Sequence, residues 1–243
     1  MNKLVVVGIG PGAADEMTVR ALRALERAEV IVGYDGYVDL IRPMLPDKAF
    51  LQTPMRREAE RCRLAIDAAL SGRAVAVISS GDAGVYGMAG MLCELAEGVE
   101  GLEIEVIPGV TAAISGAARL GAPLGHDFAV ISLSDLLTPW EKIEARLESA
   151  ARADLCLALY NPASRKREDH LTRACDILLR HASGATVCGV VRNIAREGER
   201  AEIMTLSQLR EYRADMFTTA FVGNSQTRVI AGKMVTPRGY KYG

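Results

Sequence analysis

Apolar and polar positions along the chain follow two alternating spacings. The first is a short run of consecutive apolar residues bounded by Gly, Pro, Asn or Asp, which is typical of a buried strand. Runs of this kind predict strands over 4–7, 30–33, 74–79, 103–107, 128–132, 155–160, 186–191, 202–205 and 217–222. Most of the chain's apolar side chains therefore lie in segments short enough to be single strands.

The second spacing places apolar residues three and four positions apart, as on one face of a helix. It predicts helices over 18–28, 57–70, 86–95, 112–120, 139–150 and 168–181. Over 57–70 one face collects Ala59, Cys62, Ile66, Ala69 and Leu70, and Gly72 follows as a stop signal. Strands that alternate with helices predict an α/β fold with mostly parallel sheets.

A stretch rich in Gly and Pro, 119–127, interrupts this alternation near the middle of the chain. Such stretches commonly separate domains. We place the boundary within 109–125 and predict an N-terminal α/β domain over 1–112 and a C-terminal α/β domain over 113–243.

Composition and charge narrow the classes of partner. The 243 residues are 49% hydrophobic, with 29 Lys and Arg against 30 Asp and Glu, so the net charge does not favour nucleic acid or an anionic membrane. No apolar stretch approaches the roughly 18 residues that a membrane-spanning helix needs. We expect a cytoplasmic protein that binds neither nucleic acid nor membrane.

Cysteine and histidine spacing predicts no metal site. The five cysteines form no CxxC pair and lie in apolar patterns, so we expect reduced and mostly buried thiols. The three histidines lie far apart and match no metal-binding motif.

The first strand runs into a glycine-rich loop, Gly8-Ile9-Gly10-Pro11-Gly12. With Ala13 it fits a relaxed dinucleotide fingerprint, and Asp35 after the next strand is in the place of a ribose ligand. However, Pro11 lacks an N–H, two acidic residues follow it, and the helix is predicted to begin near Thr18. We therefore interpret the loop as a close turn at the sheet edge and not as a dinucleotide site.

Two further loops follow predicted strands. In Ser79-Ser80-Gly81-Asp82-Ala83-Gly84, a carboxylate framed by glycines is suited to binding hydroxyl groups, although Asp82 could instead cap the next helix. In Pro108-Gly109-Val110-Thr111-Ala112, Thr111 could hold a ligand or cap the helix that follows.

Later strands also end in polar residues. The segment 160–167, YNPASRKR, joins Asn-Pro to a serine and three cations, and 192–193 adds Arg and Asn. The segment 222–227 is VGNSQT, and the chain closes with TPRGY at 236–240.

Taken in order, GIGPG, GYDGY, ISSGDAGVYGMAG, IPGVTA, GAPLGHDF, ISLSDLLTPW, YNPASRKRE, VGNSQT and TPRGY resemble the motifs of the tetrapyrrole (corrin/porphyrin) methyltransferases. The resemblance runs from the first strand to the last residues. GIGPG alone is shared with related enzymes such as diphthine synthase. The pairing of YNPASRKR with HDF, ISLSDLLTPW and TPRGY is more specific, and is similar to the ring-contracting members of cobalamin synthesis.

The resemblance implies two α/β domains with an active-site cleft between them, usually in a homodimer, and S-adenosyl-L-methionine as cofactor. Carried over by motif, the cofactor-binding residues are Gly81, Asp82, Val85, Tyr86, Thr111, Ala112, Tyr160, Asn161 and Asn193. The loop with Gly10 and Pro11 is implied to face the tetrapyrrole.

The implied substrate is a corrinoid precursor with carboxylate arms, and any cobalt belongs to that substrate. Arg pairs well with carboxylates, so we expect contacts from Arg56, Arg165, Arg167, Arg192 and Arg238, with Arg57 and Lys166 as further candidates. Solvated surface charge is the alternative for about half of these cations. Ring contraction needs proton transfers, for which we nominate His126, Asp127, Ser134 and Asp135; a structural role for His126 is nearly as well supported.

Two other functions stay open at this level. One is another methylase of the same fold, acting on a different precorrin carbon or on a diphthine precursor. The other is a nucleotide-binding module with a Rossmann-like loop.

Overall fold

A computed structural model describes residues 2–164 and 167–241. The chain divides into two compact units, Met1–Thr111 and Ala112–Gly243. No helix within the described residues is long and apolar enough to cross a membrane.

The first unit is built on a five-stranded sheet in the order β3-β2-β4-β1-β5, and every pairing in it is parallel. The strands are β1 (Asn2–Gly8), β2 (Val30–Tyr34), β3 (Ala49–Thr53), β4 (Val75–Ser79) and β5 (Leu102–Ile107). Because all five run in one direction, their carboxyl ends lie along the same edge of the sheet.

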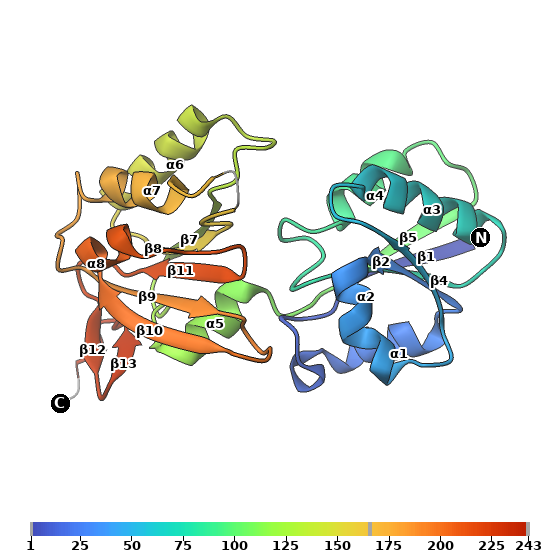
Figure 1. Ribbon diagram of the computed structural model, residues 1–243, viewed down its shortest axis with the longest axis horizontal. Helices are drawn as coiled ribbons and strands as arrows, with labels where there is room; N and C mark the ends of the chain where they lie inside the picture. The colour runs from blue at the N-terminus through green and yellow to red at the C-terminus, as the bar shows by residue number, and fades with distance from the viewer. Residues whose placement is uncertain (1, 165–166, 242–243) are drawn as a thin grey trace. The chain divides into compact units, whose positions relative to one another are not determined.

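Helices cover both faces of this sheet (Figure 1). They are α1 (Val19–Arg27), α2 (Asp35–Ile41), α3 (Glu58–Leu70) and α4 (Ala89–Leu95), with short 3-10 turns η1 (Ala14–Glu16) and η2 (Arg42–Met44). Alternate residues of β1 point to opposite faces: Val7 packs with α1 and α2, whereas Leu4 and Val6 pack with α3 and α4.

Local signals explain where these helices begin and end. The Thr18 side chain accepts a hydrogen bond from the backbone N–H of Ala21 and so caps α1 at the predicted position. The predicted face of α3 is confirmed for Cys62, Ile66 and Ala69, which are buried. It is wrong for Leu70, the last residue of α3, which is 42% exposed.

The second unit contains a mixed five-stranded sheet in the order β10-β9-β11-β8-β7. The strands are β7 (Phe128–Ser132), β8 (Cys156–Tyr160), β9 (Val187–Arg192), β10 (Arg200–Thr205) and β11 (Thr218–Val222). β7 pairs with β8 in parallel, but the other three pairings are antiparallel. The expectation of mostly parallel sheets therefore holds for the first unit and fails for the second, where β10 and β11 reverse direction.

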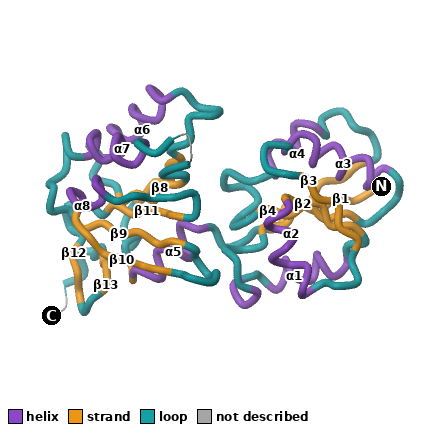
Figure 2. The backbone as a smooth tube through the Cα atoms, viewed as in Figure 1, coloured by secondary structure: helices purple, strands orange, loops and turns teal. Residues whose placement is uncertain are grey.

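Helices α6 (Trp140–Arg152), α7 (His170–Leu178) and α8 (Leu206–Glu211) cover one face of this sheet, and α5 (Ala112–Leu120) packs on the other (Figure 1). A three-stranded sheet joins β6 (Gly121–Ala122) to the hairpin of β12 (Arg228–Ile230) and β13 (Lys233–Val235), near the C-terminus in Figure 2. Met234 of β13 is fully buried and packs with α5.

The hydrophobic pattern predicts the longer elements to within a few residues, and it misses short ones. Those missed are β3, β6, β12, β13, α2 and α8. α8 carries a signal that could have identified it: Thr205 and Gln208 form a reciprocal capping box at its N-terminus.

Candidate functional site

Glycine-rich loops meet at the carboxyl edge of the first unit's sheet. Gly10 follows β1 and Gly81 follows β4, and their backbones exchange hydrogen bonds of 3.1 Å and 2.7 Å. The loop after β5 joins them, since a Cβ atom placed on Gly109 would lie 2.1 Å from the carbonyl oxygen of Gly81. A Cβ on Gly8 would lie 2.6 Å from the Gly109 nitrogen. Gly8 and Gly109 must therefore be glycines, because neighbouring backbone atoms leave no room for a Cβ atom.

Asp82 fastens these loops together. Its Oδ1 accepts a hydrogen bond from the N–H of Gly84 at 2.8 Å, and its Oδ2 accepts one from the N–H of Gly109 at 2.9 Å. The alternative that Asp82 caps the next helix is wrong, because α4 begins at Ala89 after Met88 and has no side-chain cap. The carboxylate instead fixes the loops that follow β4 and β5.

The same geometry argues against a dinucleotide site. The N–H groups of Ile9 and Gly10, which would face a pyrophosphate, donate to the carbonyls of Ser79 and Gly81. In the doubly wound dinucleotide fold β2 lies beside β1, but here β4 lies between them. Asp35 therefore lies a strand away from the ribose-binding position and begins α2.

The remaining predicted residues of the first unit lie in the same loops. Pro11 is buried, Val85 and Thr111 are half-buried, and Tyr86 is 59% exposed with a left-handed backbone. Arg56 follows β3 at this carboxyl edge and is exposed. The loop after β4 thus presents accessible backbone, with little side chain covering Gly84.

In the second unit β7, β8 and β9 point the same way, so their carboxyl ends share an edge. The Tyr160 hydroxyl at the end of β8 accepts a 2.6 Å hydrogen bond from the N–H of Ala113, at the start of α5 beside Ala112. Asn161 and Asn193 follow β8 and β9 with positive φ, which Asn tolerates better than most residues. The Asn161 side chain donates to the Ser132 hydroxyl at 2.9 Å.

Two of the nominated acid/base residues lie at this edge. Arg167 Nη1 donates to the Ser134 hydroxyl at 2.8 Å and lies 3.3 Å from Asp135 Oδ1. The Arg167 side chain is 15% exposed and so belongs to a polar cluster inside the loop. Arg165 lies outside the described residues.

His126 and Asp127 lie elsewhere. They precede β7, whereas Ser134 and Asp135 follow it, so the length of that strand, roughly 15 Å, separates the two pairs. Both residues are exposed, and the Asp127 N–H donates to His126 Nδ1 at 2.8 Å. The structure does not bring the four nominated residues together.

The other predicted cations differ in their surroundings. Arg192 Nε donates to Asp215 Oδ2 at 2.7 Å. Partial burial would raise the pKa of Asp215, but hydrogen bonds from Arg192, Thr218 and the Phe217 N–H hold that pKa below its usual value. Arg57 is exposed and pairs with Glu60. Arg238 is exposed and follows Thr236, which contacts Cys156 at the start of β8, away from the carboxyl edge.

His170 is the residue at this site that sequence patterns missed. It begins α7 and is buried, with Nε2 3.6 Å from Asp135 Oδ2. In the sequence it is a lone histidine after a loop rich in cations. Because His170 follows Asp135 by 35 residues, no local spacing in the sequence indicates that the two side chains are in contact.

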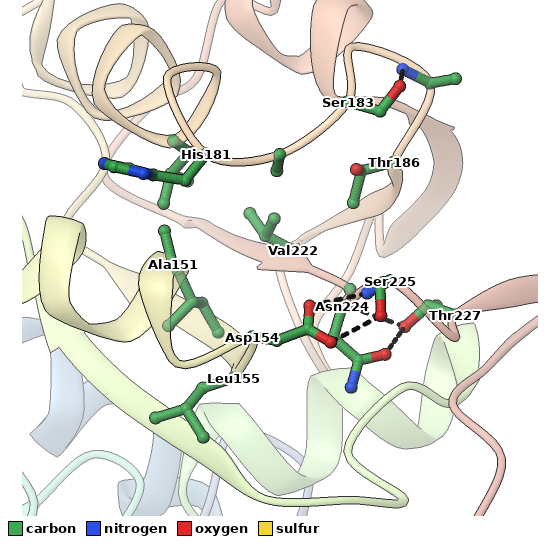
Figure 3. Close-up of a pocket in the computed structure, with 15 residues that line it drawn as sticks. Ala151, Asp154, Leu155, His181, Ser183, Thr186, Val222, Asn224, Ser225 and Thr227 are labelled. Carbon is green, nitrogen blue, oxygen red and sulfur yellow. Dashed lines mark hydrogen bonds between the residues drawn. The ribbon is translucent and has the colours of Figure 1, made fainter.

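The VGNSQT motif lies at the opposite edge of the second sheet, because β11 runs antiparallel to β8 and β9. It borders a pocket of about 360 Å³, drawn in Figure 3. Ser225 closes one side by donating from its N–H and its hydroxyl to the Asp154 carboxylate, at 2.8 Å and 2.6 Å. The motif therefore shapes this end of the sheet and is remote from Tyr160 and Asn193.

Across residues 2–164 and 167–241, no group of three or more His, Cys, Asp or Glu is arranged to hold a metal ion. Four cysteines are buried and Cys93 is exposed; the buried ones are Cys62, Cys156, Cys175 and Cys188. Burial raises the pKa of Cys62 to about 11 and that of Cys175 to about 12.

Fold and site together define an α/β protein of two units, in which loops at strand ends carry the candidate binding residues. Residues 3–210 match the family model of the Tetrapyrrole (Corrin/Porphyrin) Methylases. The chain belongs to this family.

Relatives match along nearly the whole chain. A Salmonella typhimurium protein named probable cobalt-factor III C(17)-methyltransferase is 49% identical, over 98% of this chain and 99% of its own length. A precorrin-3B C(17)-methyltransferase from Sinorhizobium sp is 40% identical, over 98% of this chain and 96% of its own. The crystal structure of the methyltransferase CobJ superposes with a TM-score of 0.90 at 38% identity, covering 98% of this chain and all (100%) of that one.

Proposed function

We propose that the protein methylates C17 of precorrin-3B or cobalt-factor III and contracts the ring, giving precorrin-4 or cobalt-precorrin-4 in cobalamin biosynthesis. The observation that carries this proposal is the 49% identity, over 98% of this chain, to a relative named for that methylation. The Sinorhizobium relative, which is named for precorrin-3B, supports methylation at the same ring carbon. The proposal therefore includes two possible substrates, precorrin-3B and cobalt-factor III.

The proposed cofactor is S-adenosyl-L-methionine, which supplies an electrophilic methyl group on a sulfonium. In the first unit the residues assigned to it are Gly81, Asp82, Val85, Tyr86 and Thr111. In the second they are Ala112, Tyr160, Asn161 and Asn193. Three features of the loops fit such a ligand: accessible backbone around Gly84, glycines where a Cβ would clash, and a carboxylate that fixes the loop shape.

Methyl transfer from sulfur to carbon needs alignment and exclusion of water more than a strong base, and alignment can supply about 7–11 kcal/mol. For ring contraction, Ser134 and Asp135 are better supported than His126 and Asp127, since they lie at the edge that carries Tyr160 and Asn161.

For the substrate carboxylates we propose Arg56, Arg165 and Arg238, of which Arg56 and Arg238 are exposed. We propose that the loop with Gly10 and Pro11 faces the tetrapyrrole ring. Arg167 and Arg192 are already paired with Asp135 and Asp215. A substrate carboxylate at Arg192 would therefore compete with Asp215 for that side chain, and one at Arg167 would share the guanidinium with Asp135.

We further propose two α/β domains over 1–112 and 113–243, a homodimer and a cytoplasmic location. The near balance of 29 Lys and Arg with 30 Asp and Glu supports a soluble small-molecule enzyme over a protein that binds nucleic acid or membranes.

The test is incubation with S-adenosyl-L-methionine and either precorrin-3B or cobalt-factor III, followed by mass spectrometry and determination of the methylated carbon. Methylation at C17 of either substrate supports the proposal, and the faster substrate identifies the pathway. Methylation at another ring carbon, or of a diphthine precursor alone, would instead establish a different methylase. Calorimetry with S-adenosylhomocysteine and NAD separates both from a nucleotide-binding module, which would bind NAD.

A further inference from the structure

The imidazole of His170 joins two parts of the loop that follows β7. Its Nδ1 lies 2.8 Å from the carbonyl oxygen of Leu133, and its Nε2 lies 3.6 Å from Asp135 Oδ2. The His170 side chain is 4% exposed, whereas that of Asp135 is 36% exposed. A buried ring thus contacts a carboxylate that solvent, or a ligand, can reach.

The hydrogen-bond partners assign the protons. A carbonyl oxygen only accepts, so Nδ1 must carry hydrogen and donate to Leu133. In a neutral ring Nε2 would then be an acceptor that faces an acceptor oxygen of Asp135. One more proton on Nε2 turns this repulsion into an imidazolium–carboxylate attraction.

Neighbouring side chains hold the ring in place. The Trp140 ring lies 4.8 Å from the His170 ring, and the guanidinium of Arg173 lies 3.9 Å above Trp140. Arg173 in turn lies 4.0 Å from Asp169, the residue before His170. Among the described residues, these contacts bring the charged groups of Asp135, Arg167, Asp169 and Arg173 near the ring.

We propose that His170 is a positioning residue for the ring-contracting methylation. Its imidazole ring and the Arg167 guanidinium flank the Asp135 carboxylate from two sides, and so fix Asp135 and Ser134 in the geometry in which they meet the tetrapyrrole. This inference rests on the proposed function, and it adds a residue that neither the motifs nor the resemblance assigned.

Two amide variants separate positioning from simple anchoring. The amide of Asn overlaps the place of Nδ1, so H170N keeps the donor to Leu133 and loses the contact with Asp135. The longer side chain of Gln overlaps the place of Nε2, so H170Q keeps a donor toward Asp135 without needing a proton. We expect H170N to lower kcat on the order of 10-fold to 100-fold, because Asp135 would lose one of the two side chains that flank it. We expect H170Q to stay within about 3-fold of wild type.

The matched control is H181N, because His181 also pairs with a carboxylate, Glu148, at 3.2 Å but on α6 and outside this loop. It should retain wild-type kcat, and S-adenosylhomocysteine should bind H170N as it binds wild type. In a D135N background, H170N should cause little further loss, since His170 acts through Asp135.

Several outcomes would overturn the positioning role. They are wild-type kcat in H170N, loss of the fold in H170N, or a larger loss of kcat in H170Q than in H170N, which would indicate an anchor to Leu133. Failure of the wild-type enzyme to methylate either tetrapyrrole is a separate result, seen before any variant is compared; it would overturn the proposed function and this inference with it.

Discussion

The Asp82 carboxylate accepts a hydrogen bond from the backbone N–H of Gly109, 27 residues further along the chain, at 2.9 Å. The bond ties the loop after β4 to the loop after β5, while the other carboxylate oxygen holds Gly84. The sequence predicts Asp82 as a ligand for hydroxyl groups. In the structure, its carboxylate fixes the backbone around a binding loop.

Replacing Asp82 by Asn should loosen this loop. The amide keeps one acceptor oxygen and sets an NH₂ group against the second backbone N–H, so we expect a loss of about 1–3 kcal/mol in unfolding free energy. The affinity for S-adenosylhomocysteine should fall in parallel. Urea unfolding and calorimetry measure the two effects, with D39N, a change at an exposed aspartate of the same unit, as control. Unchanged stability in D82N would contradict the fastening role.

Two glycine-to-alanine changes in the same unit should change the free energy of unfolding in opposite directions. G109A would set its Cβ 2.1 Å from the Gly81 carbonyl, and backbone cannot yield cheaply, so a loss of about 1–3 kcal/mol or more is expected. G90A lies within α4 with nothing within 4 Å of its Cβ and should stabilise by about 0.5–1 kcal/mol. Urea unfolding of both variants tests the pair, and equal effects would rule out the close approach.

The contribution of the Arg192–Asp215 pair to the free energy of unfolding should depend on pH and be lost in acid. Because the folded pKa of Asp215 lies below its unfolded value of about 3.9, its stabilisation is complete above that pH and is lost as pH falls through the folded pKa. R192A should therefore be less stable than wild type near pH 7. The difference should narrow as pH falls below the unfolded pKa of Asp215 and through its lower folded pKa, because a protonated Asp215 no longer pairs with Arg192. Urea unfolding at about pH 7 and at a series of more acidic pH values measures it, and a difference that is constant with pH would count against the pair.

Thiol reactivity should follow burial. Alkylation of the native protein with iodoacetamide near pH 8 should modify Cys93, which is exposed. Cys62 and Cys175 should stay unmodified because burial blocks access and raises their pKa to about 11 and about 12. Mass spectrometry before and after denaturation in urea counts the labels. Rapid native labelling of Cys175 would show that the packing around α7 opens.

Local patterns in the sequence were sufficient to predict many of the strands and helices and to identify the family. Runs of apolar residues mark β1, β4 and β8, and Thr18 marks the start of α1, because each depends on residues close together in the chain. The glycine loops and the motifs after the strands likewise identify the family, since they are contiguous segments.

The tertiary structure decided what depends on partners distant in the chain. The reversed direction of β11 sends VGNSQT to the far edge of its sheet, and β7 separates His126 from Ser134. Asp135 gains Arg167 and His170 as neighbours, and Asp82 gains Gly109. Strand direction and side-chain pairing are fixed by contacts that form when distant segments pack, so no local spacing in the sequence could encode them.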